Sequence, residues 1–189
     1  MFCLDNLRTQ TPTRCPIAVG PGVHVSDTVG ADTVVSDIFM QQAAQLALDN
    51  VKSGKGGPFG AVIVRNGEIV AGGVNRVTAE NDPTAHAEVS AIREAARLLG
   101  SFDLSGCEIY TSCEPCPMCL GAIYWARLDR VYYGCTQQDA AAIGFDDQFI
   151  YQELDRPKAQ RALPILQSGR AEAIRAFEAW QDSADKVSY

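Results

Sequence analysis

The chain has 189 residues, of which 47% are hydrophobic and 21% charged, which suits one well-buried globular domain. Its net charge is −7 and it has no lysine or arginine run, so it lacks the electrostatic footprint of a nucleic-acid binder. A small-molecule substrate is the better expectation. No apolar stretch approaches the ~20 residues that span a bilayer, so we expect no membrane association.

Cysteine usage indicates the compartment. The chain has 7 cysteines, an odd number without the regular spacing of a disulfide framework. The first fifteen residues also lack a continuous apolar region of signal-peptide length. We therefore expect a reducing, cytoplasmic environment.

The first half of the chain predicts an extension, a helix and a hairpin. Residues 1–35 are rich in Thr, Pro, Gly and Asp and are interpreted as an extension of uncertain order that precedes a folded domain over residues 36–189. Ser36 is a capping residue before an amphipathic helix that ends near the glycine-rich residues 53–57. Asn66-Gly67 between two apolar runs predicts a hairpin of strands 59–65 and 68–75.

Helices and strands alternate in the second half. A helix is predicted from His86 to a stop at Gly100, a strand over 108–112, a helix over 116–127 and a strand over 130–135. Residues 163–167 predict a fifth strand, which Pro164 makes irregular or places at an edge. Residues 170–185 predict a last helix. This order predicts a three-layer α/β/α fold, in which a mixed five-stranded sheet carries helices on both faces.

The motif His86-Ala87-Glu88 and the pair Cys116 and Cys119 supply a metal site and a proton carrier. Imidazole nitrogen and thiolate sulfur are zinc ligands, and a catalytic zinc keeps three protein ligands so that water fills the fourth position. Zinc lowers the pKa of bound water from ~15.7 to about 7. His86, Cys116 and Cys119 are therefore the predicted zinc ligands, and Glu88 is the predicted general acid/base.

Spacing sets a condition on the geometry of this site. Cys116 and Cys119 are three residues apart, which places them on one face of a helix that Pro117 helps to start. His86 and Glu88 would point ~200° apart inside a regular helix, so both reach one ion only from its first turn. Both helix starts follow a strand or its loop, so they can converge at one edge of the sheet.

A structural zinc module is the alternative from a different functional class. Cys113 lies three residues before Cys116 and could close a four-ligand site, and a lone Cys-x-x-Cys can also be a redox pair. Cys113 ends an apolar run, however, where a small buried thiol is an ordinary core residue. The joint pattern of His-x-Glu and Pro-Cys-x-x-Cys is typical of zinc-dependent nucleobase deaminases.

These motifs resemble the cytidine deaminase superfamily, and within it the bacterial guanine deaminases. The two longest matching stretches are residues 81–88 and 111–127, and shorter ones are 57–62, 144–147, 149–151 and the terminal Tyr189. The resemblance covers residues 36–189 and leaves the N-terminal extension unmatched.

The resemblance implies zinc-dependent hydrolysis at C2 of guanine, which releases xanthine and ammonia, with Glu88 carrying protons to the ring nitrogen and the leaving amine. It implies that Asn75 hydrogen-bonds the purine, that Phe59 stacks on it opposite His86 and that Asp147 accepts a ring N–H. From composition alone, Asn75 would be a turn residue, Phe59 a core aromatic and Asp147 part of a solvated acidic loop.

The resemblance also implies a domain-swapped homodimer, in which a C-terminal segment of about residues 163–189 crosses to the partner and Tyr189 closes the partner's pocket. Two other substrates stay open. A tRNA adenosine deaminase would need Lys/Arg contacts to phosphates, which this acidic chain does not offer. A guanosine deaminase would need a pocket that admits a ribose.

Overall fold

The structure is a computed structural model that describes residues 31–188, with side chains from residue 37 onward. Most of the N-terminal extension and Tyr189 lie outside the described residues. Helix α1 covers Ala31–Lys52, so it begins upstream of Ser36, and the prediction that Ser36 caps it is wrong. Residues 31–35 contain neither glycine nor proline, and the helical hydrogen-bond ladder therefore continues through them.

The predicted hairpin is confirmed. Strands β1 (Gly60–Arg65) and β2 (Glu68–Val74) pair antiparallel. The turn residues Asn66 and Gly67 have φ of 53° and 75°. Both lie in the left-handed region that a two-residue hairpin turn with Asn-Gly requires.

The sheet is mixed, as predicted, but it has four strands in the order β2-β1-β3-β4. Strand β3 (Cys107–Cys113) runs antiparallel to β1 and parallel to β4 (Arg130–Cys135). The predicted fifth strand is wrong, because residues 163–167 have no regular structure. A strand needs a hydrogen-bonded neighbour, and this segment pairs with no strand among the described residues.

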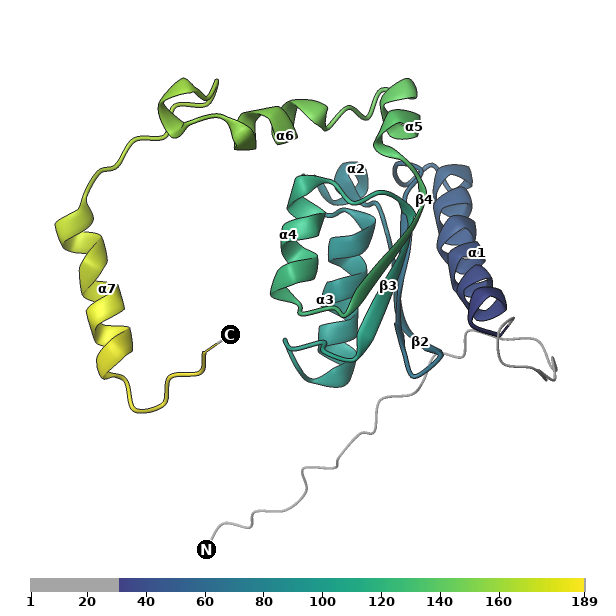
Figure 1. Cartoon of the computed structure of the whole chain (residues 1–189), viewed down its shortest axis with the longest axis horizontal. Coiled ribbons are helices and arrows are strands. Elements are labelled where there is room, and N and C mark those ends of the chain that lie inside the picture. The colour runs from purple at the N-terminus through teal and green to yellow at the C-terminus, as the bar shows by residue number, and fades with distance from the viewer. Residues whose placement is uncertain (1–30, 189) are drawn as a thin grey trace, which may run out of the picture.

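Helices cover both faces of the sheet and give the predicted three layers (Figure 1). Helix α1 lies on one face, and α3 (Ala87–Leu99) and α4 (Pro117–Trp125) lie on the other. Neighbouring residues of β1 point into different cores: Val62 contributes to the α1 side and Ile63 to the α3 side. This alternation is the period of two that a sheet buried on both faces needs.

Helix α3 lies unusually close to β2. The residues of α3 that are fully buried are mostly alanines, including Ala87 and Ala91. A Cβ atom on Gly73 of β2 would lie 2.3 Å from the carbonyl oxygen of Ala87 and 2.4 Å from the nitrogen of Ala91. The small residues on both sides therefore set the position of the start of α3, where His86 lies. The predicted stop at Gly100 is confirmed, with φ of 64°.

Beyond β4 the chain leaves the sheet. The predicted last helix is found there as α7 (Arg170–Asp182). The sequence analysis did not predict three elements of this part, α5 (Gln137–Ala142), α6 (Gln148–Asp155) and the 3-10 turn η1 (Lys158–Gln160), nor the short helix α2 (Val77–Glu80) after β2. Helix α4 ends at Trp125 and not at residue 127, because Arg127 is left-handed with φ of 57°. The segment from α6 to α7, here called the C-terminal arm, extends away from the sheet (Figure 1) and contains no buried residue in either helix.

Within residues 31–188, no helix combines the length and the apolarity needed to cross a bilayer.

Candidate active site

His86 is the N-cap residue of α3, and the loop before it is held on two sides. The carboxylate of Asp82 accepts hydrogen bonds from the backbone N–H and the hydroxyl of Thr84, at 2.8 and 2.7 Å. The N–H of Arg76, just after β2, donates to the carbonyl of Ala85 at 2.9 Å. The loop is thus pinned to itself and to the end of the hairpin, and the imidazole starts from a fixed backbone.

Cys116 is the N-cap residue of α4, Pro117 begins the helix and Cys119 lies in its first turn. The loop that leads to Cys116 is also held. The N–H of Glu114 donates to the carbonyl of Cys135 at 2.8 Å, and the hydroxyl of Tyr151 in α6 donates to the carbonyl of Pro115 at 3.1 Å. The two helix starts predicted to converge therefore do so.

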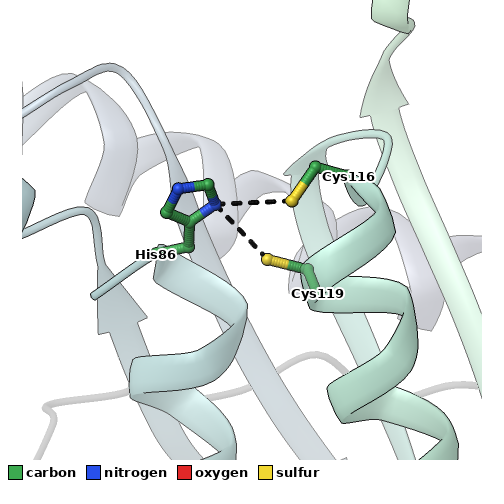
Figure 2. Close-up of side chains that lie close together, drawn as sticks. All are labelled: His86, Cys116 and Cys119. Carbon is green, nitrogen blue, oxygen red and sulfur yellow. Dashed lines mark hydrogen bonds between the residues drawn. The ribbon is translucent and has the colours of Figure 1, made fainter. Parts of the chain in front are cut away.

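The three predicted zinc ligands point toward one another (Figure 2). The Nδ1 atom of His86 lies 3.6 Å from the sulfur of Cys116 and 3.5 Å from the sulfur of Cys119, and all three ligand atoms lie within 4.8 Å of one another. A tetrahedral zinc with Zn–N of about 2.05 Å and Zn–S of about 2.3 Å separates nitrogen from sulfur by about 3.6 Å. Both nitrogen–sulfur distances therefore match those of a tetrahedral zinc site.

Cys113 is not a fourth ligand. It is buried at the end of β3, and its thiol contacts the carbonyl of Thr136 at 3.6 Å. The group of possible ligands found among residues 31–188 contains His86, Cys116 and Cys119 without it. Three is the number of protein ligands that a catalytic zinc keeps, with water as the fourth.

The side chains of Cys116 and Cys119 hydrogen-bond to each other. This bond lowers the pKa of the Cys116 thiol to about 4 and, together with burial, raises the pKa of Cys119. A zinc ion needs both sulfurs as thiolates, so its binding would release the proton of Cys119.

Glu88 lies in the first turn of α3, two residues after His86, and only 6% of it is exposed. Burial raises the pKa of its carboxyl group above the ordinary 4.5, and its side chain hydrogen-bonds with Cys119. The condition that His86 and Glu88 share the first helical turn is met. A buried carboxyl beside the ligands, with a pKa shifted toward neutrality, is suited to take up and return protons.

Asp147 comes directly before α6 and faces the same ligands. Burial raises the pKa of its carboxyl group, and the nearby charge of Cys116 raises it further. The pKa of His86 is raised mainly by its hydrogen bond with Cys116, and the charge of Asp147 adds to the effect. Asp147 is therefore a neighbour of the metal ligands.

Asn75 follows β2 and is buried, with 7% of it exposed. Its side-chain oxygen accepts hydrogen bonds from the N–H groups of Gly57 and Val77, at 3.3 and 3.4 Å, and its own N–H donates to the carbonyl of Phe59 at 3.1 Å. The two predicted substrate contacts, Asn75 and Phe59, are thus adjacent. Tyr189 lies outside the described residues.

Phe59 is partly buried against the core, and its ring meets Phe145 edge-on, with centroids 4.9 Å apart and planes at 89°. Phe145 was not among the predicted site residues. It lies two residues before Asp147, so the contact brings the Asp147 loop and Phe59 to the same side of the site.

Comparison with known proteins agrees with this geometry. Residues 35–135 match the family described as "Cytidine and deoxycytidylate deaminase zinc-binding region". The chain belongs to this deaminase family. It is a zinc-binding family, and the matched range contains Glu88 and the group of His86, Cys116 and Cys119 that could hold the metal.

The relatives of this deaminase include guanine deaminases and tRNA-specific adenosine deaminases. The deaminase is 54% identical to guanine deaminase from Bacillus subtilis (strain 168) over 81% of its own length and 98% of that protein. It matches the X-ray structure of that enzyme with a TM-score of 0.79 over the same shares of each chain. It is 38% identical to a tRNA-specific adenosine deaminase from Agrobacterium fabrum, over 64% of its own length and 79% of that protein.

A solved structure of guanine deaminase from Nitrosomonas europaea is 28% identical, with a TM-score of 0.57 over 75% of this deaminase and 82% of that chain. The guanine deaminase from Bacillus subtilis is thus more similar than either of the other two.

Proposed function

We propose that this protein hydrolyses guanine to xanthine and ammonia, with one catalytic domain over about residues 36–189. The observation that carries the proposal is the buried Glu88 beside a His/Cys/Cys set at zinc spacing. The 54% identity to guanine deaminase of Bacillus subtilis supports guanine as the substrate.

A zinc ion held by the three ligands would make water a nucleophile at neutral pH. Glu88 takes one proton from the attacking water and passes it to the ring nitrogen next to C2. It then takes the second proton, from the hydroxyl now bound to C2, and passes it to the leaving amine. One water is consumed, the bond between C2 and the exocyclic nitrogen breaks, and ammonia leaves. The burial of Glu88 keeps bulk water from carrying the same protons.

Asn75, Phe59 and Asp147 orient the base. The oxygen of the Asn75 side chain is engaged by two backbone N–H groups, while Nδ2 donates no hydrogen bond within residues 31–188, which leaves this N–H pair for an acceptor atom of the purine. Phe59 stacks on the ring opposite His86. Asp147 accepts a ring N–H, a charge-assisted contact that a carboxylate makes well with guanine.

The active assembly is a domain-swapped homodimer in which the C-terminal arm binds to a second copy and Tyr189 closes its pocket. The arm supports this proposal because it exposes many large apolar side chains, namely Phe149, Ile150, Leu154, Leu163, Ile165, Leu166, Phe177 and Trp180. Helix α4 exposes Tyr124 and Trp125 as well.

Deletion of residues 186–189 tests the role of the C-terminus. We expect a dimer by light scattering that retains zinc but has a strongly reduced kcat/KM for guanine, because the pocket stays open to water. Unchanged kinetics would mean that the terminus takes no part in catalysis.

The substrate is tested by ammonia release from guanine, guanosine, cytidine and adenosine in a tRNA anticodon stem-loop, measured side by side. We expect guanine to have the highest kcat/KM. A higher value for guanosine or for the tRNA stem-loop would overturn the proposal, and metal-dependent turnover of any of the four would exclude a structural zinc module.

The cysteines described, which are all free thiols, support a cytoplasmic location.

A further inference from the structure

Asn50, near the end of α1, is a buried polar residue that the proposed reaction does not use. It is 6% exposed. Its Nδ2 donates two hydrogen bonds, to the carbonyl of Asn75 at 2.8 Å and to the carbonyl of Gly57 at 2.9 Å. Both hydrogens of the amide are thus satisfied by backbone from two other segments of the chain.

These two carbonyls belong to the segments that carry the proposed purine contacts. Gly57 lies two residues before Phe59, and its N–H donates back to the side chain of Asn75 at 3.3 Å. Asn50, Gly57 and Asn75 therefore form a closed set of hydrogen bonds. The Gly57 N–H contacts the side chain of Asn75 directly, and the two bonds from Asn50 hold the backbone of Asn75 and of Gly57 in place around it.

The backbone around these three residues is also tightly packed. A Cβ atom on Gly56 would lie 2.0 Å from the carbonyl oxygen of Asn75 and 2.9 Å from Nδ2 of Asn50. The loop before Phe59 thus approaches the end of β2 as closely as backbone can. The contact leaves no room for a side chain at residue 56, so glycine there allows the loop to lie against both Asn75 and Asn50.

We infer that Asn50 is a positioning residue for the purine site: it holds the loop of Gly57 and Phe59 against Asn75 and so fixes both substrate contacts. This inference rests on the proposed function. It differs from a purely structural role for Asn50, which would change stability but not the balance between KM and kcat.

The test is Asn50→Asp, which keeps the shape but turns a donor toward two carbonyl oxygens into an acceptor. We expect KM for guanine to rise about 10-fold to 100-fold, as displacement of a substrate contact by about 1 Å does, with zinc content unchanged. Gln45→Glu is the matched control, because it makes the same change in the same helix at an exposed side chain, whose amide donates to Asp49. It should leave KM unchanged.

A double-mutant cycle with Asn75→Ala separates positioning from stability. If Asn50 acts through Asn75, Asn50→Asp should change kcat/KM much less in the Asn75→Ala background than in the unchanged protein. Equal effects in both backgrounds, or a lower Tm with unchanged KM, would overturn the inference.

Amide hydrogen exchange supplies a measurement that does not depend on guanine turnover. We expect Asn50→Asp to accelerate exchange at Gly57 and Val77, which donate to Asn75, while Ile63 and Ile109 in the sheet stay protected. If the unchanged protein does not deaminate guanine, the proposed function fails, and the exchange data still decide whether Asn50 holds this loop. Equal exchange in both proteins would contradict the role.

Discussion

Replacement of Glu88 by glutamine separates proton transfer from zinc binding. Glutamine has nearly the same size and no proton to transfer at neutral pH. Glu88 lies outside the group of His86, Cys116 and Cys119 that holds the metal, so we expect Glu88→Gln to retain one zinc per chain. Its kcat for guanine should fall strongly.

The size of the loss follows from the burial of Glu88. One general acid or base contributes about 10²-fold to 10⁴-fold, and Glu88 serves more than one transfer. Because only 6% of the residue is exposed, bulk water cannot replace it, and we expect a loss of at least about 10⁴-fold. This corresponds to about 5.4 kcal/mol in the barrier, at ~1.36 kcal/mol for each factor of ten.

The assay combines steady-state ammonia release with metal analysis of the purified protein. Cys116→Ala is the comparison, because it removes a ligand and should lose both zinc and activity. Zinc lost together with activity in Glu88→Gln would refute the division of roles, and so would a loss of turnover below about tenfold.

Three further predictions address the surroundings of the site. Asp147→Ala should lower kcat/KM for guanine by two orders of magnitude or more with little change in Tm; full activity with a lower Tm would make Asp147 structural. Gly73→Ala should destabilise the fold by about 1–3 kcal/mol in chemical denaturation, because its Cβ would meet the backbone of α3 at 2.3 Å. Gly121→Ala is the control: its Cβ would meet nothing within 4 Å, and alanine favours a helix more than glycine does, so this change should stabilise the fold. Thr84 lowers the pKa of Asp82 below 3.8, so this carboxylate stabilises the fold above pH 3.8 and the contribution is lost as the pH falls through the lowered value. The difference in unfolding free energy between the unchanged protein and Asp82→Ala should therefore be constant from pH 7 to pH 5; a decrease within that range would contradict the reasoning.

The metal centre could be predicted because its signals are local. His86, Glu88, Cys116 and Cys119 lie in two short segments, and each segment marks the start of a helix by its own residues. The Asn-Gly turn of the first hairpin is equally local, since the φ values it needs suit those two residues and few others. The hairpin turn is confirmed, and the structure brings His86, Cys116 and Cys119 together as predicted, while the roles of these residues and of Glu88 stay predictions.

Features that depend on distant partners could not be predicted. Residues 163–167 have the composition of a strand but no strand beside them among the described residues. Asn50 lies in an amphipathic helix, where asparagine usually faces water, and its role becomes visible only through a contact with Asn75, 25 residues away. The contact between Phe59 and Phe145 depends in the same way on how the chain returns after β4.

His86 and Cys116 both occupy the N-cap positions of their helices, and neither makes a side-chain capping bond. A serine, threonine or aspartate there would stabilise each helix by about 1 kcal/mol. At these two helix starts, candidate metal ligands therefore occupy positions where a capping side chain would add stability. A bound metal would also act as a shared cap, because it would immobilise both N-cap side chains at once. It would thereby add stability to the first turns of α3 and α4, including the turn that carries Glu88.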